Sequence, residues 1–128
     1  MVKSVSVVSR KSVKNDNIYT CIEVDIGYKK IKLFADNGIY QTLTNLNPLE
    51  FSNLLVDEPC LVGCKTISLK KAHSVKKDVD YMYLEFDVGF TKVSVFTDNF
   101  TYCDLFDITP KTFYNIQINE PIVLKVGE

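Results

Sequence analysis

Histidine is nearly missing from this chain, and tryptophan is missing altogether. The one histidine among 128 residues is His73, which lies in a lysine-rich segment where an imidazole is typically solvated rather than catalytic or bound to a metal. The sequence also has no glycine-rich phosphate loop, no nucleophile elbow and no Ser/His/Asp order of a hydrolase. These absences argue against an enzyme, and we expect neither catalytic residues nor a cofactor.

Long apolar runs are absent as well. No stretch approaches the roughly 20 apolar residues that span a bilayer. The opening residues, MVKSVSVVSRKS, lack the long apolar segment of a secretory signal. We therefore expect a cytoplasmic protein that does not interact with a membrane.

What the sequence does contain is one stretch that occurs twice. Residues 19–36 read YTCIEVDIGYKKIKLFAD, and residues 81–98 read YMYLEFDVGFTKVSVFTD. Comparing residues 3–62 with residues 65–124 without a gap gives 21 identical positions out of 60. This pattern predicts a tandem duplication of a unit of about 62 residues.

The expected boundaries are 1–63 for repeat unit 1 and 64–128 for repeat unit 2. A unit of this length alone would bury only about 60% of its unfolded surface and would be marginally stable. We therefore expect the two units to form one compact body, sharing a core around a pseudo-twofold axis.

The four cysteines do not follow the repeat. Positions 62 residues away from Cys21, Cys60, Cys64 and Cys103 hold other residues. Cys60 and Cys64 also lack the paired clusters of a zinc ribbon or finger. We expect reduced thiols that act as small hydrophobes, and no metal site.

Alternation of apolar and polar residues predicts strands at the start of each unit, over 3–7 and 65–69. The repeated stretch then predicts a hairpin, since Gly27 and Gly89 lie where a turn needs positive φ. With a two-residue turn at Ile26 and Gly27, Glu23 faces Lys30 and Tyr19 faces Phe34. Such a pairing puts an acid opposite a base and one aromatic ring opposite another.

The remainder of each unit predicts a further strand, a short helix and a closing strand. An Asn or Thr followed by Pro48 or Pro110 is typical of a helix start. The expected ranges are Tyr40–Leu43 and Tyr102–Leu105 for the strand, 48–55 and 110–116 for the helix, and Cys60–Val62 and Ile122–Lys125 for the closing strand.

The predicted fold is therefore mainly β, with the order β-β-β-β-(short α)-β in each unit and two small barrel- or sheet-like halves. In strand count and in the placement of its basic loop, the unit resembles a small OB-like or SH3-like barrel. That resemblance implies a fold and no particular function.

Charge is unevenly distributed along the chain. The net charge is −1, yet residues 1–16 carry a balance of +3, residues 65–78 carry +4, and the remainder carries −8. The positive charge is concentrated in two predicted loops, 9–16 and 70–78. Basic loops beside a strand face with aromatic rings are used to bind single-stranded nucleic acid, because cations follow phosphates and rings stack on bases.

Our first hypothesis is therefore a non-enzymatic protein that binds single-stranded DNA or RNA. The residues expected to do so are Arg10, Lys11, Lys14, Lys70, Lys71, Lys76, Lys77, Tyr19, Phe34, Tyr81, Tyr83 and Phe96. The composition, rich in Lys, Asn, Asp, Tyr and Phe, suits an accessory protein of a phage or plasmid from an AT-rich host.

The alternative is a protein-binding regulator, inhibitor or assembly factor whose partner is a host or phage protein. A pI of about 5.8 and the net negative charge outside the basic loops favour it. The carboxylate pairs Glu23/Asp25 and Glu85/Asp87 could serve acid–base chemistry or cation binding. We instead expect Glu23 and Glu85 to form ion pairs across the hairpins.

Overall fold

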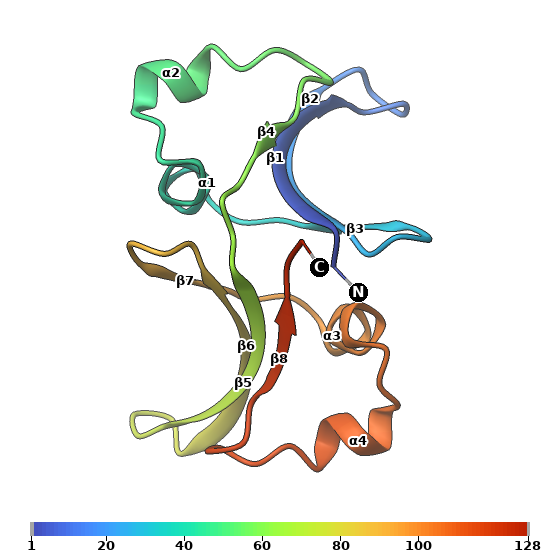
Figure 1. The fold of residues 1–128 in the computed structure, drawn as a ribbon, viewed down its shortest axis with the longest axis vertical. Coiled ribbons are helices and arrows are strands. Elements are labelled where there is room, and N and C mark those ends of the chain that lie inside the picture. Colours follow the sequence, from blue (N-terminus) through green and yellow to red (C-terminus); the bar gives the residue numbers. More distant parts are fainter. Residues whose placement is uncertain (1, 128) are drawn as a thin grey trace.

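A computed structural model describes residues 2–127 and contains two antiparallel four-stranded sheets, stacked one above the other in Figure 1. The first sheet has the strand order β3-β2-β1-β4 and is accompanied by two short helices. Its elements are β1 (Ser4–Lys11), β2 (Ile18–Asp25), β3 (Lys30–Leu33), α1 (Asn37–Thr44), α2 (Pro48–Ser52) and β4 (Cys60–Leu61).

The second sheet has the corresponding order, β7-β6-β5-β8. Its elements are β5 (Thr66–Ser74), β6 (Val79–Asp87), β7 (Lys92–Val95), α3 (Asn99–Phe106), α4 (Pro110–Tyr114) and β8 (Ile122–Lys125). The mainly β character predicted from the sequence is confirmed, and each half contains an open sheet with two edge strands rather than a closed barrel.

The first strand of each half is longer than predicted, and the expected basic loops are correspondingly shorter. β1 continues to Lys11 and β5 continues to Ser74, so Arg10, Lys70 and Lys71 lie on strands. In β1 the ladder is supported by the buried Ser9 hydroxyl, which lies 3.0 Å from that of Thr20. The prediction of loops over 9–16 and 70–78 was wrong in this respect.

The two hairpins within the repeated stretch are confirmed, but their register differs from the prediction. Glu23 is opposite Lys32 and Asp25 is opposite Lys30, so four residues connect β2 to β3. The loop closes through the amide of Ile26, which donates to the carbonyl of Lys29 at 3.0 Å. Because the side chain of Ile26 is buried, it cannot occupy the tip of a two-residue turn.

The predicted strands at Tyr40–Leu43 and Tyr102–Leu105 are wrong, since these residues belong to α1 and α3. The preceding aspartates, Asp36 and Asp98, act as helix N-caps and accept the amides of Ile39 and Thr101. The pairs Asp36-Asn37 and Asp98-Asn99 thus mark the starts of the two helices. Each half has the order β-β-β-α-α-β.

The short helices after the prolines are confirmed, although they are shorter than predicted. Asn47 and Glu50 form a capping box at the start of α2, and Thr109 caps α4. The closing strands are confirmed at Cys60–Leu61 and Ile122–Lys125, each paired with the first strand of its sheet.

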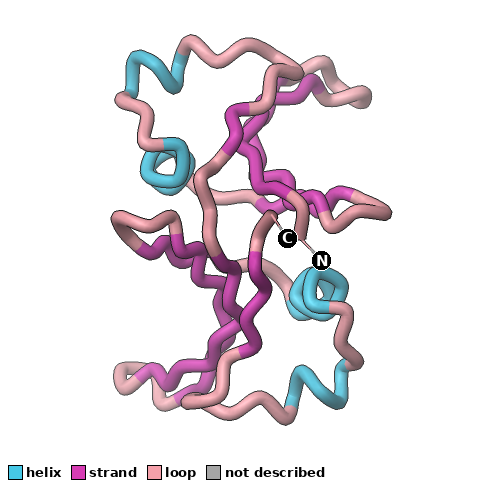
Figure 2. Tube along the Cα trace, in the orientation of Figure 1, coloured by secondary structure: helices cyan, strands magenta, loops and turns pink. Residues whose placement is uncertain are grey.

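One hydrophobic core joins the two sheets. The inner faces contribute side chains such as Val7, Ile22, Leu69 and Phe86, each fully buried in the same cluster. The helices lie on one side of each sheet, as the cyan segments of Figure 2 show. Across the junction, α1 lies against β7. Among residues 2–127, no helix has the length and apolar character needed to cross a membrane.

Candidate nucleic-acid interface

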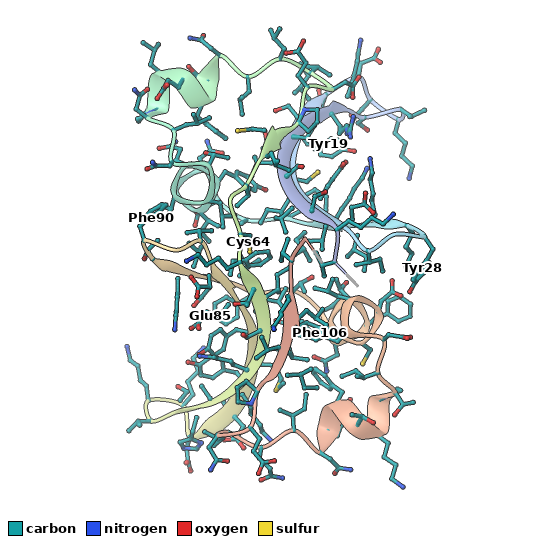
Figure 3. The ribbon with its side chains drawn as sticks, viewed as in Figure 1. Tyr19, Tyr28, Cys64, Glu85, Phe90 and Phe106 are labelled. Atoms are coloured by element: carbon teal, nitrogen blue, oxygen red, sulfur yellow. The ribbon has the colours of Figure 1, made fainter. Side chains whose placement is uncertain are left out.

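Each sheet has an outer face that points away from its helices. In Figure 3, Tyr19 lies on the side of the first sheet remote from α1, and Glu85 lies on the side of the second sheet remote from α3. Along β3 and β7, exposed and buried residues alternate. The exposed residues, beginning with Lys30 and Lys92, lie on these outer faces. The outer faces are therefore the surfaces that the helices leave uncovered.

An aromatic pair lies on the outer face of the first sheet. The ring centroids of Tyr19 and Phe34 are 6.0 Å apart, and Phe34 is 59% exposed. The ammonium group of Lys32 lies 5.4 Å from the Tyr19 ring centroid and donates to its hydroxyl at 2.9 Å. This hydrogen bond raises the pKa of Lys32. The two rings thus form an aromatic surface, with the ammonium group of Lys32 beside it.

The corresponding place on the second sheet holds three rings. Tyr81, Tyr83 and Phe96 lie 5.8–6.1 Å apart in every pairwise combination. The third ring arises because Tyr83 stands where the first sheet has Cys21, 62 residues earlier. Tyr81 is 40% exposed and Phe96 is 59% exposed, so the prediction's aromatic residues do gather into two surface clusters.

The predicted cation Arg10 is committed to carboxylates. Its guanidinium donates two hydrogen bonds to Glu23, at 2.9 and 3.0 Å, and one to Asp57 at 2.8 Å. Glu23 is 7% exposed, and the hydrogen bond from Arg10 lowers the pKa of its carboxyl. Arg10 therefore secures a nearly buried acid and has little capacity left for a phosphate.

Two of the predicted lysines on β5 are similarly engaged. Lys70 lies 2.9 Å from Glu85, and this interaction raises the pKa of Lys70. Lys71 lies 3.8 Å from Asp80, which also contacts His73 at 2.8 Å. The ion pair expected between Glu23 and Lys30 is wrong, because Lys30 lies opposite Asp25 and Arg10 of β1 binds Glu23 instead. Glu85 is paired mainly with Lys70 of β5, and Lys92, its expected partner on β7, is farther away at 4.0 Å.

The remaining predicted cations lie around the tips of the β1–β2 and β5–β6 hairpins. Lys14, Lys76 and Lys77 are exposed and form no ion pair among the described residues, while Lys11 lies 3.9 Å from Asp16. Figure 1 places the two hairpin tips at opposite ends of the molecule. The structure therefore separates the two basic regions, each beside one aromatic cluster.

Sequence reasoning missed three lysines on the outer faces. Lys30 and Lys32 occupy the exposed positions of β3, in phase with Phe34 just after the strand, and Lys92 is in phase with Phe96 just after β7. The period-2 spacing in KIKLF and KVSVF was the available signal. The expected pairing of Lys30 with Glu23 and of Lys92 with Glu85 explains why two of these lysines are absent from the sequence-based set; it does not account for Lys32.

The thiols and the histidine do not form a metal centre. Within the described range 2–127, no three His, Cys, Asp or Glu side chains are placed to hold an ion together. Cys21 and Cys64 are buried free thiols, and burial raises the pKa of Cys64 to about 11. Such a thiol is protonated near neutral pH, which suits a small apolar side chain better than a ligand.

The chain was compared with models of protein families, with curated proteins and with solved structures, and none of the three comparisons finds a match.

Proposed function

We propose that this protein is a non-enzymatic binding protein that holds single-stranded nucleic acid against the outer faces of its two sheets. The observation that carries the proposal is the exposure of both aromatic clusters beside lysines that, within residues 2–127, have no carboxylate closer than the 4.0 Å between Lys92 and Glu85. Phe34 and Phe96 are each 59% exposed on the same faces as Lys32 and Lys92. Exposed rings can stack on unpaired bases while lysines neutralise the phosphates.

The contact residues differ from the sequence-based set. In the first sheet the rings are Tyr19 and Phe34, and the cations are Lys14, Lys30 and Lys32. In the second sheet the rings are Tyr81, Tyr83 and Phe96, and the cations are Lys76, Lys77 and Lys92. Arg10 and Lys70 support these surfaces through their ion pairs, whereas Lys71 and Asp80 line a hollow beside α3 and α4.

The test is a fluorescence-anisotropy titration of labelled single-stranded DNA and RNA at several salt concentrations. Three lysines per face predict that log K falls with log salt at a slope of about −2 for each site. Duplex DNA should bind more weakly, because its bases are not available for stacking. Absence of binding at low salt would overturn the proposal.

Paired variants distinguish a real interface from nonspecific attraction. Phe96→Ser should weaken binding about tenfold or more, since stacking of a base on one ring contributes roughly 1–3 kcal/mol. Lys76→Ala combined with Lys77→Ala should weaken binding and flatten the salt slope. Lys111→Ala on α4 is the matched control, because it removes one exposed charge away from both outer faces. An equal loss in the control would contradict a defined interface.

The proposal includes the origin of the two halves, as a duplication of one unit whose copies are related by a pseudo-twofold axis. It is supported by the 21 identical positions and by the equal strand orders β3-β2-β1-β4 and β7-β6-β5-β8. We also propose a cytoplasmic role as a phage or plasmid accessory protein, which rests on composition. Recovery of the protein with single-stranded phage or plasmid DNA after cross-linking in its host would test that role.

A further inference from the structure

The helices α3 and α4 border an apolar groove, which meets the outer-face aromatic cluster at Tyr81, in the lining of one of its hollows. Its central hollow has a volume of about 240 Å³, and its walls are Asn99, Phe100, Cys103, Pro110, Phe113 and Tyr114. A second hollow of about 410 Å³ shares Asn99, Phe113 and Tyr114 and extends towards Lys71 and Asp80. A third, of about 280 Å³, shares Phe100, Cys103 and Pro110 and extends towards Asp104 and Asp107.

The floor of this groove is buried and the walls are exposed. Phe113 is only 4% exposed, stacks on Tyr102 with a centroid distance of 5.9 Å, and meets Tyr114 edge-on at 5.5 Å. By contrast, Phe100 is 80% exposed and Tyr114 is 68% exposed. Two large rings thus stand in water on either side of a packed aromatic floor.

The corresponding helices of the first sheet show which of these residues the fold needs. The floor recurs there, since Tyr40 stacks on Phe51 at 6.1 Å. The walls do not recur, because Gly38 and Ser52 stand 62 residues before Phe100 and Tyr114. Helices α1 and α2 have the same lengths as α3 and α4 without those rings. The exposed rings of Phe100 and Tyr114 are therefore not needed to form the helices.

Charge indicates what the groove accepts. Of the two carboxylates at its α3 end, Asp104 already binds Lys29, whereas exposed Asp107 forms no ion pair among the described residues. In α1 the corresponding cap residue is the uncharged Asn45. An apolar groove with an unpaired carboxylate at one end is complementary to a peptide segment. That segment would carry a large apolar side chain for the groove and, after it, a basic side chain for the carboxylate.

We infer that the α3–α4 groove docks a peptide segment of a partner protein, with an aromatic or leucine side chain over Phe113 and a lysine or arginine at Asp107. This inference does not depend on the proposed nucleic-acid function, which uses the outer faces. Aromatic residues in packed pockets commonly dominate binding free energy at such interfaces.

The absence of tryptophan from the chain allows a direct assay. The probe is a short capped peptide with one tryptophan anchor and one lysine placed two or three residues away, titrated with the protein while tryptophan emission is recorded. A second peptide has glutamate in place of the lysine. The lysine peptide should bind with a blue-shifted emission and the glutamate peptide several-fold more weakly. Equal binding of the two peptides, or none by either, would overturn the inference.

Three variants replace a groove residue by the residue found 62 positions earlier, in the first half. Because the first half folds with those residues, we expect the variants to remain folded. Phe100→Gly and Tyr114→Ser should each raise the Kd for the lysine peptide about tenfold, which corresponds to about 1.4 kcal/mol. Asp107→Asn should remove the preference for lysine over glutamate. Phe96→Ser, on the outer face, should leave peptide binding unchanged. Urea unfolding curves of all four variants verify that each remains folded.

Two further outcomes would count against a peptide partner. Concentration-dependent self-association that Tyr114→Ser abolishes, measured by sedimentation velocity, would make a second copy of this chain the occupant. Weaker binding of single-stranded DNA by Phe100→Gly would make the groove part of the nucleic-acid surface. Unchanged sedimentation and unchanged DNA binding, together with the loss of peptide binding, would support the inference.

Discussion

The ammonium group of Lys29 lies 2.6 Å from both carboxylate oxygens of Asp104, residues that are 75 positions apart. Lys29 belongs to the loop between β2 and β3, and Asp104 belongs to α3. The contact therefore joins the first sheet to a helix of the second half. The hydrogen bond to Asp104 raises the pKa of Lys29.

This ion pair should stabilise the packing of the two halves in a salt-dependent manner. Lys29→Ala and Asp104→Ala should each lower the urea midpoint at low salt, and the double variant should lower it by less than the sum of the two. Because both side chains are partly exposed, the coupling should decline as salt screens it. A coupling that persists unchanged at 1 M salt would show that packing, rather than charge, joins these residues.

The hydroxyl of Tyr102 should contribute to stability. It accepts the amide of Thr97 at 3.0 Å and donates to the carbonyl of Met82 at 3.2 Å, and the side chain is 2% exposed. Tyr102→Phe leaves both backbone groups without this partner, and we expect a loss of about 1–3 kcal/mol in the free energy of unfolding. The measurement is urea denaturation followed by circular dichroism.

Tyr28→Phe provides the control for this loss, because Tyr28 is 73% exposed at a hairpin loop, where Figure 3 shows it pointing outwards. Its stability should match that of the wild type. If both tyrosine variants lost equal stability, the two hydrogen bonds of the Tyr102 hydroxyl would not be the cause of the loss.

Gly89 should resist substitution because of its backbone conformation. Its φ is +93°, and a Cβ there would meet only the flexible end of Lys65, at 3.5 Å. Backbone strain is therefore the main expected cost, and Gly89→Ala should destabilise the protein by about 1–2 kcal/mol. Gly89→Val should cost more, because a β-branched side chain suits this region least.

Gly63→Ala is the matched control for this substitution, since its φ is not positive and, apart from its chain neighbours, no described residue has a heavy atom within 4 Å of the added Cβ. Thermal unfolding of the variants gives the comparison. A harmless Gly89→Ala would contradict the assigned turn.

The pair of Arg10 and Glu23 should make stability depend on acidic pH. The pKa of Glu23 is lowered in the folded protein by the hydrogen bond from Arg10. Its stabilising effect is thus fully present above the unfolded value of about 4.3 and is lost as pH falls through the folded value. Glu23→Gln should remove this dependence, so the stability difference between the wild type and the variant should shrink below about pH 4.

Arg10→Ala should also destabilise the protein at neutral pH, by about 1–3 kcal/mol, because the nearly buried Glu23 loses its partner. Lys11→Ala should have little effect, since Lys11 is 60% exposed and its distance from Asp16 is 3.9 Å. Parallel pH profiles for the wild type and Glu23→Gln would show that another acid controls the transition.

The sequence alone determined the elements whose signals are local. Alternation of Val5 and Val7 with serines predicted a half-buried strand, and Pro48 and Pro110 marked the starts of α2 and α4, because strand period and helix capping depend on neighbouring residues. The repeated stretch also predicted the hairpins and the faces of their aromatic residues. A register error of two residues left those faces unchanged, since side chains alternate with period two.

Only the tertiary structure decided the assignments that depend on distant residues. The apolar positions around Tyr40 fit a strand or a helix, and packing selects the helix because the Tyr40 hydroxyl reaches the carbonyl of Thr20. From the sequence, Arg10 is expected to be a free cation. In the folded protein it binds Asp57, which lies 47 positions later in the chain. Ion pairs and exposure arise from the way the chain folds back on itself, and therefore the usable cations and the α3–α4 groove became visible only in three dimensions.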